Sequence, residues 1–229
     1  MESATVVIRV QCLMRLVLVN PNTSASTTAM MVEIARTAAP GSEIDGLTAQ
    51  IGEPMITNPA ALATAADAVQ AMAPELTRRQ PDGVMIAGFG DPGLRRLRDM
   101  LTCPVTGIAE AAMAEAAQEG RRFAVVTTTP DLAPSIRDAA EAYGHGALLA
   151  GIALTKSDPM QLMADQRRLE LELDAACRVA VTDLRAQAII IGGGPLALAA
   201  RELRSRVAVP LIEPIPAAVR LALARARAG

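Results

Sequence analysis

Two short polar segments combine the residue types that hold small polar ligands. The first is Asn20-Pro21-Asn22-Thr23-Ser24, and the second is Thr127-Thr128-Thr129-Pro130-Asp131. Each follows an apolar run and precedes a helix-like stretch, so it offers amides, hydroxyls and the first N–H groups of a helix. Such groups suit a carboxylate or the carbonyls of a cyclic imide. Helix capping alone would also explain these residues, and the sequence leaves both interpretations open.

Two glycine turns add a second feature that is typical of ligand sites. Gly88-Phe89-Gly90 and Gly192-Gly193-Gly194 would let the backbone approach a ligand closely. Neither turn fits the spacing of a dinucleotide-binding or phosphate-binding loop, so no nucleotide is predicted. The candidate substrate-binding residues are Asn20, Asn22, Thr23, Phe89, Gly90, Thr127, Thr128, Thr129 and Gly194.

Other catalytic chemistries find little support. The three cysteines, Cys12, Cys103 and Cys177, are odd in number and fit no metal-site spacing, so we expect them to be structural. His145 is the only histidine, which disfavours a histidine metal site and a charge-relay triad. We therefore expect no metal and no cofactor.

Composition excludes further classes of function. The net charge is −2 and aromatic residues make up 1% of the chain, which disfavours nucleic-acid binding. The arginines of segment 201–206 alternate with apolar residues, as on a solvated helix face. No apolar run reaches the roughly 18 residues that span a bilayer, and no signal peptide is recognisable. We expect a cytoplasmic homo-oligomer without disulfides.

The elements that must position these loops alternate along the chain. Near-continuous apolar runs at 15–19, 83–87, 123–127 and 187–192 are typical of strands buried on both faces of a parallel sheet. Between them lie Ala-rich stretches of helical period, at 59–79, 108–119, 159–184 and 196–206. This alternation predicts an α/β fold.

An internal repeat organises these elements. A strand, a glycine turn, a helix and a Pro-started strand occur twice, with Val84 matching Ile189 (189 − 84 = 105) and Pro104 matching Pro210 (210 − 104 = 106). We therefore predict two pseudo-symmetric lobes, each a mainly parallel four-stranded sheet flanked by helices. Ligands of such sheets bind at the carboxyl ends of the strands, so the ligand cleft should lie between the lobes.

The polar and glycine-rich segments together resemble the Asp/Glu/hydantoin racemase superfamily, and most of all its hydantoin and allantoin racemases. The resemblance rests on 20–24, on Gly88-Phe89-Gly90-Asp91-Pro92-Gly93-Leu94, on the block 104–112 and on the turn 191–194. It implies a cofactor-independent isomerase that clamps a small carboxylate or cyclic ureide between two lobes. Residues 14–112 plus 211–229 would form the first lobe and 113–210 the second, with 1–13 as an N-terminal extension.

The sequence departs from the family at the positions that do the chemistry. The resemblance implies two cysteines, one per lobe, that exchange protons on opposite faces of the α-carbon, but Gly88 and Gly193 stand at those positions. A positioned acid or base contributes roughly 10²–10⁴ in rate, so thiol racemisation should be lost. The glycines would leave open volume, and cysteines at both positions should restore some proton exchange.

Carboxylates near strand ends are the remaining acid–base candidates. Glu110 is the first of them, and Glu213 occupies a similar place in the second lobe. Asp91 is a candidate as well, although capping of a helix explains it better.

Several functions stay open at this stage. The chain could act on its ligand by altered chemistry, as a decarboxylase or other isomerase that uses a carboxylate or water. It could instead be a catalytically silent binding relative, or a variant from which both cysteines were removed. Proton exchange in deuterated water separates the enzymatic from the silent alternative.

Overall fold

Eight strands form two sheets in the computed structural model, which describes residues 13–228. The first sheet has the order β2-β1-β3-β4 and the second β6-β5-β7-β8, and every pairing is parallel. The strands are β1 (Met14–Asn20), β2 (Ser42–Thr48), β3 (Gly83–Ile86), β4 (Val105–Gly107), β5 (Phe123–Thr127), β6 (Leu149–Leu154), β7 (Ala188–Ile191) and β8 (Leu211–Ile212). The predicted α/β fold with two four-stranded parallel sheets is confirmed. The predicted extension, residues 1–13, lies outside the described residues apart from Leu13.

The helices follow the predicted stretches, with interruptions that the sequence explains. They are α1 (Ala25–Ala38), α2 (Pro59–Ala71), α3 (Ala73–Arg79), α4 (Leu94–Met100), α5 (Ile108–Ala116), α6 (Ala133–Ala142), α7 (Pro159–Met163), α8 (Gln166–Thr182), α9 (Ala197–Leu203) and α10 (Pro214–Ala228). The stretch predicted at 159–184 is two helices, because the Asp165 side chain accepts a hydrogen bond from the Arg168 N–H and starts α8 there. Ser24 caps α1 in the same way through the N–H of Thr27.

Strand residues alternate between two kinds of core. Leu16 and Leu18 of β1, and Phe123 and Val125 of β5, face a central core that also contains residues of α1, α5, α6 and α10. Their neighbours face outer layers: the first sheet packs there against α2, α3 and α4, and the second against α7, α8 and α9. Both faces of the inner strands β1, β3, β5 and β7 are buried over most of their length, which is why these strands are near-continuously apolar.

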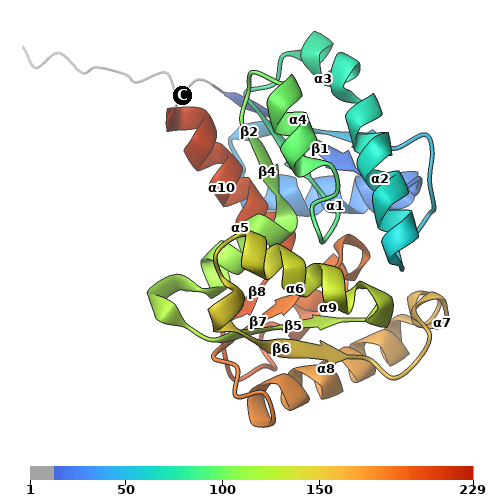
Figure 1. The fold of residues 1–229 in the computed structure, drawn as a ribbon, viewed down its shortest axis with the longest axis vertical. Coiled ribbons are helices and arrows are strands. Elements are labelled where there is room, and N and C mark those ends of the chain that lie inside the picture. The colour runs from blue at the N-terminus through green and yellow to red at the C-terminus, as the bar shows by residue number, and fades with distance from the viewer. Residues whose placement is uncertain (1–12, 229) are drawn as a thin grey trace, which may run out of the picture.

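The two lobes exchange their last helices. After β4 the chain enters α5, which packs against β7 and β8 of the second sheet, and after β8 it enters α10, which returns to β1, β3 and β4. Figure 1 shows the lobes one above the other, with α10 running back along the first. The exchange fixes the carboxyl ends of both sheets relative to each other. No helix of the described chain is long and apolar enough to cross a membrane.

Candidate functional site

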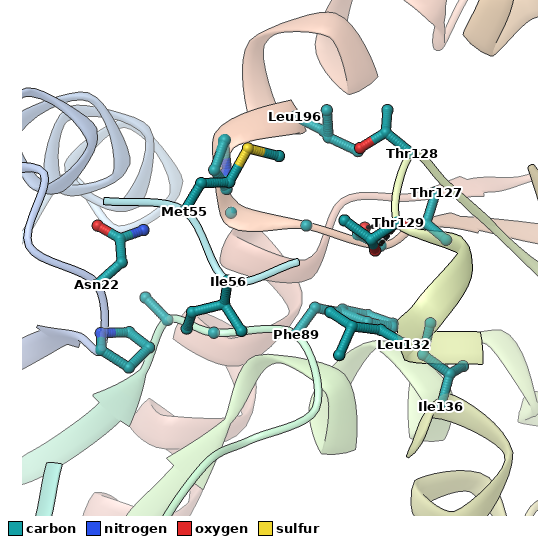
Figure 2. A pocket seen from close by; sticks show the side chains of 17 residues that line it. Asn22, Met55, Ile56, Phe89, Thr127, Thr128, Thr129, Leu132, Ile136 and Leu196 are labelled. Atoms are coloured by element: carbon teal, nitrogen blue, oxygen red, sulfur yellow. Dashed lines mark hydrogen bonds between the residues drawn. The ribbon is translucent and has the colours of Figure 1, made fainter. Parts of the chain in front are cut away.

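A cavity lies between the lobes where the strands of both sheets end (Figure 2). Its free volume is about 50 Å³, which holds a few water molecules, so a larger ligand requires some separation of the walls. The residues that line it are Pro21, Asn22, Met55, Ile56, Ala87, Gly88, Phe89, Thr127, Thr128, Thr129, Leu132, Ile136, Gly192, Gly193, Gly194, Pro195 and Leu196. Four of the predicted loops, those after β1, β3, β5 and β7, therefore meet at one place.

The loop after β1 presents an amide to this cavity. The side-chain oxygen of Asn22 accepts hydrogen bonds from the Asn20 amide at 2.8 Å and from the Ser24 N–H at 2.9 Å. No described residue accepts a hydrogen bond from the Asn22 amide nitrogen, which is thus free to donate to a ligand. Asn20 is fully buried and also binds Thr28 at 3.0 Å, so it holds the loop and does not line the cavity. Thr23 does not line it either, and its N–H donates to the Glu53 carbonyl.

Three consecutive threonines form the opposite wall. The Thr127 hydroxyl donates to the Gly192 carbonyl at 2.8 Å and pairs with the Thr129 hydroxyl at 3.1 Å. The bond to Gly192 ties the loop after β5 to the glycine turn after β7. That turn begins the short 3₁₀ helix Gly194–Leu196, in which Pro195 has no N–H and the Leu196 N–H donates to the Gly193 carbonyl at 3.0 Å. The N–H groups of Gly193 and Gly194 have no acceptor among the described residues. The wall therefore offers hydroxyls and backbone N–H groups to a ligand.

Neither Gly88 nor Gly193, the positions where the resemblance predicts cysteines, leaves open space for a side chain. A Cβ on Gly88 would lie 2.5 Å from Pro21 Cγ and 3.2 Å from Pro92 Cδ. Gly193 has φ of +152°, a conformation that side chains rarely adopt, and its Cβ would lie 3.2 Å from Leu196. The sequence-based expectation of empty volume at Gly88 is wrong, because Pro21 fills that volume.

The rest of the cavity wall is apolar. Phe89 extends from the loop after β3 and lies on the same wall as Leu132 and Ile136 of the second lobe (Figure 2). Its ring also covers the glycine turn, since a Cβ on Gly192 would lie 2.9 Å from Phe89 Cε1. Gly90 lies outside the cavity, beside Leu62. Phe89 is therefore one of the first-lobe residues that contact the second lobe at this site, together with Met31 and Ala87 beside Gly194.

No Asp, Glu, Lys, Arg, His, Cys or Tyr stands among the residues that line the cavity. Its polar side chains are the amide of Asn22 and the three threonine hydroxyls, none of which titrates near neutral pH. Among residues 13–228, no group of three His, Cys, Asp or Glu side chains could hold a metal ion. The cavity can thus bind by neutral hydrogen bonds and apolar contact.

Glu110, the predicted acid–base residue, is not brought to the cavity. Its carboxylate accepts hydrogen bonds from Arg98 of α4 at 2.7 Å and from Arg225 of α10 at 2.8 Å. Although burial opposes ionisation, these two arginines lower the pKa of Glu110 below its usual value. A carboxylate held ionised by two cations is a poor proton acceptor, and Glu213 likewise pairs with Arg204, at 3.6 Å.

Asp91 caps a helix, but this helix is α5, which packs against the second sheet, and not α4, which follows Asp91 directly in the chain. Its carboxylate accepts the N–H groups of Ala109 at 2.9 Å and Glu110 at 2.7 Å, the first turn of α5. The Tyr143 hydroxyl donates to the same carboxylate at 2.7 Å. Burial outweighs these donors and raises the pKa of Asp91 to about 6.

The described cysteines lie away from the cavity. Cys103 is half-buried beside the outer core of the first sheet, and burial raises the pKa of its thiol. Cys177 is buried in α8, and burial raises the pKa of its thiol to about 12. Neither can supply a thiolate to the cavity at neutral pH. Cys12 lies outside the described residues.

Comparison with known proteins settles the family. The family model described as Asp/Glu/Hydantoin racemase matches residues 16–222. The chain belongs to the Asp/Glu/hydantoin racemase family. A hydantoin racemase of Rhizobium meliloti is 32% identical over 222 residues, covering 94% of this chain and 90% of its own. A hydantoin racemase of Paenarthrobacter aurescens is 29% identical, covering 91% of this chain and 89% of its own.

Solved structures share the fold of both lobes. An allantoin racemase from Klebsiella pneumoniae has a TM-score of 0.87 at 32% identity, covering 92% of this chain and 86% of its own. An arylmalonate decarboxylase, at 17% identity, shares the fold with a TM-score of 0.65, covering 94% of this chain and 93% of its own. The relatives and structures that are about 30% identical to this chain are thus hydantoin and allantoin racemases.

Sequence reasoning missed the apolar half of the site. Met55 and Ile56 lie in the segment between β2 and α2, where Gly52 marks a bend but no near-continuously apolar strand precedes it. In the sequence, Leu132 and Ile136 look like ordinary helix residues, and Leu196 looks like the first residue of a helix. The sequence analysis searched for polar residues and glycines after strands, and such a search does not find apolar side chains that reach the cavity from other segments.

Proposed function

We propose that this member of the Asp/Glu/hydantoin racemase family binds a small cyclic ureide or carboxylate between its lobes without two-thiol racemisation. The observation that carries the proposal is the neutral lining of the cavity, together with glycines at both positions where the family resemblance implies cysteines. Crowding at Gly88 and the backbone conformation at Gly193 support glycine as an integral part of this site.

The disposition of polar and apolar groups favours a hydantoin-like ring over a carboxylate. A carboxylate is usually matched by a cation or by several N–H groups of a helix N-terminus. The cavity lining has no cation, and the short 3₁₀ helix in its wall offers the N–H groups of Gly193 and Gly194, because Pro195 has none and the Leu196 N–H is already bonded. The carbonyls of a ureide ring can accept from the Asn22 amide and the backbone N–H groups, while threonine hydroxyls can accept from the ring N–H groups. Met55, Ile56 and Phe89 would then contact a substituent on the ring.

Calorimetric titration tests the binding. We expect hydantoin or allantoin to bind more tightly than phenylmalonate or aspartate. Thr128→Val, which removes a cavity hydroxyl and keeps the shape, should weaken binding about 5- to 10-fold, the value of one neutral hydrogen bond. Thr182→Val makes the same change at an exposed hydroxyl on α8 and should leave affinity unchanged. Equal effects of both substitutions would place the site elsewhere.

Proton exchange separates binding from catalysis. We expect the ring α-proton of each bound hydantoin to exchange with deuterated water no faster than in buffer, by NMR, because no lining group can accept it. Insensitivity to iodoacetamide should accompany this result. Rapid exchange that ends on alkylation of Cys103 or Cys177 would mean that the chemistry uses another site.

A further inference from the structure

The only tyrosine of the chain joins the two lobes. Tyr143 is the residue that ends α6 in the second lobe, and its hydroxyl donates a 2.7 Å hydrogen bond to Asp91 in the loop after β3. Its half-buried ring packs against both the central core and the outer core of the first sheet. This contact therefore holds the end of α6 against the first lobe.

Asp91 connects this contact to the crossing between the lobes. The same carboxylate accepts two N–H groups at the start of α5, at 2.9 Å and 2.7 Å, where the chain leaves the first sheet. Asp91 itself is 5% exposed, so other residues surround it on nearly all sides, and its backbone φ is 49°. A single buried carboxylate therefore holds the loop after β3, the first turn of α5 and the end of α6 together.

The same loop reaches the ligand cavity two residues earlier. Phe89 lines the cavity on the wall that Leu132 and Ile136, at the start of α6, also form (Figure 2). The loop thus meets α6 twice, at its start through Phe89 and at its end through Asp91. The Asp91 contact and the cavity wall at Phe89 therefore belong to one short loop.

We propose that the hydrogen bond between Tyr143 and Asp91 acts as an inter-lobe pin that fixes the separation of the cavity walls and positions Phe89. Tyr143 and Asp91 are then positioning residues, outside the cavity, for the ligand site. That Phe89 meets a ligand rests on the proposed function; the pin itself does not.

The charges around the pin make it sensitive to pH. Asp91 faces the Tyr143 hydroxyl of α6 and the carboxylate of Glu110 on α5, and Glu110 is in turn paired with Arg98 of α4 and Arg225 of α10. Burial brings the pKa of Asp91 to about 6, while burial and the Asp91 charge raise the pKa of Tyr143, so the phenol stays protonated. Protonated Asp91 must use one oxygen as a donor, which leaves fewer acceptors for its three donors. The pin should weaken as the pH falls through about 6.

Tyrosine fluorescence reads the pin without a ligand. The chain has one Tyr and no Trp, so tyrosine emission comes from Tyr143 alone. A phenol bonded to a carboxylate is quenched, so emission should rise as the pH falls through about 6. Asp91→Asn should abolish this transition, whereas Glu115→Gln, which removes a carboxylate of α5 paired with Arg220, should keep it. A wild-type protein without the transition, or Asp91→Asn with it, overturns the pin.

Hydrogen exchange covers the case in which Asp91→Asn does not fold. Tyr143→Phe removes only the hydroxyl and keeps the packed ring. At pH 7.5 it should raise amide exchange roughly tenfold over wild type in peptides covering 86–94 and 132–143, the effect of losing a hydrogen bond to a charged group. At pH 5 the two proteins should exchange alike. Equal exchange at both pH values contradicts the pin.

Allantoin as the probe then tests the link to the site. At pH 7.5 Tyr143→Phe should bind allantoin about tenfold more weakly than wild type, with equal affinities at pH 5. Equal affinity at pH 7.5 would overturn the positioning role even if the pin titrates. If wild type does not bind allantoin at all, the proposed ligand fails, while fluorescence and hydrogen exchange still decide whether the pin exists.

Discussion

The glycine loops of the two lobes occupy equivalent places in sheets of the same topology, yet glycine is required for a different reason in each. Gly88 and Gly193 are 105 residues apart, the offset of the repeat (193 − 88 = 105). At Gly88 crowding excludes a side chain, since a Cβ would lie 2.5 Å from the Pro21 ring. At Gly193 the backbone excludes it, with φ of +152°. The same residue type has therefore become fixed by packing in one lobe and by conformation in the other.

The two loops also differ at the residue that anchors them. Asp91 in the first loop corresponds by the same offset to Leu196 in the second (196 − 91 = 105). Asp91 turns away from the cavity and caps α5, whereas Leu196 lines the cavity. The first loop is held by a buried charge and the second by apolar contact, so they should respond differently to pH and to added side chains.

Cysteines at both glycine positions give the largest expected effect. Crowding at Gly88 costs about 1–3 kcal/mol, and the backbone at Gly193 costs a similar ~1–3 kcal/mol. The Gly88→Cys, Gly193→Cys protein should thus lose about 2–6 kcal/mol of unfolding free energy in urea denaturation. We expect no gain of hydantoin proton exchange, contrary to the expectation from the sequence alone. Rapid exchange in a fully stable double variant would mean that both loops can adopt the two-thiol geometry that the resemblance implies.

The pH dependence of stability should distinguish the loop that carries Asp91. Because its pKa is raised from 3.8 to about 6, the folded protein binds this proton more tightly than the unfolded chain. The resulting stability is fully present below pH 3.8 and is lost as the pH rises through about 6, by up to about 3 kcal/mol. Protonation weakens the hydrogen bonds of the carboxylate but removes the larger penalty of burying its charge.

Urea denaturation from pH 4 to pH 7.5 measures this effect. The unfolding free energy of wild type minus that of Asp91→Asn should fall over this range, because other carboxylates cancel in the difference. A difference that stays flat or rises would show that hydrogen bonds to Asp91 outweigh its burial.

Single alanines separate crowding from conformation. Gly88→Ala and Gly193→Ala should each lower the unfolding free energy by about 1–3 kcal/mol. Pro21→Ala removes the ring atom that crowds Gly88, so it should recover much of the loss in the Gly88→Ala protein and none in the Gly193→Ala protein. A double-mutant cycle measures this coupling. Coupling of Pro21 to both glycines would mean that one shared constraint acts on the two loops.

Much of the fold of the two lobes, and the position of their loops, could be predicted from the sequence. Buried parallel strands are apolar throughout, so β1, β3, β5 and β7 stood out, and the glycine turns marked where they end. The edge strands β2 (Ser42–Thr48) and β6 (Leu149–Leu154) did not, because each includes exposed or half-buried positions and a glycine. The polar loops gathered as expected because parallel strands share their carboxyl ends.

The remaining features of the site depend on which residues lie close together in the folded chain, and a sequence pattern does not give these distances. Asn20, Thr23 and Gly90 belong to the predicted loops but do not line the cavity. Met55 and Ile56 reach it from a loop that does not follow a near-continuously apolar strand. Glu110 follows a strand end as a site residue would, yet two arginines, 12 and 115 residues away in sequence, hold its carboxylate. Long-range ion pairs of this kind appear only in three dimensions.

The smallest effects should come from the carboxylates at the ends of the two sheets. Glu110→Gln removes the charge that pairs with Arg98 and Arg225 and should lower the unfolding free energy by about 1–2 kcal/mol, because both arginines are only partly exposed. Glu213→Gln removes a pair whose arginine is 72% exposed, at 3.6 Å, and should change it by less than about 0.5 kcal/mol. Neither carboxylate reaches the cavity, so both variants should keep wild-type affinity for allantoin and the same background proton exchange. Calorimetric titration and NMR in deuterated water measure these two quantities on the same samples. A loss of exchange on the order of 10²–10⁴ in Glu110→Gln alone would instead identify it as the general base, and the ion pairs with Arg98 and Arg225 would then have to open during turnover.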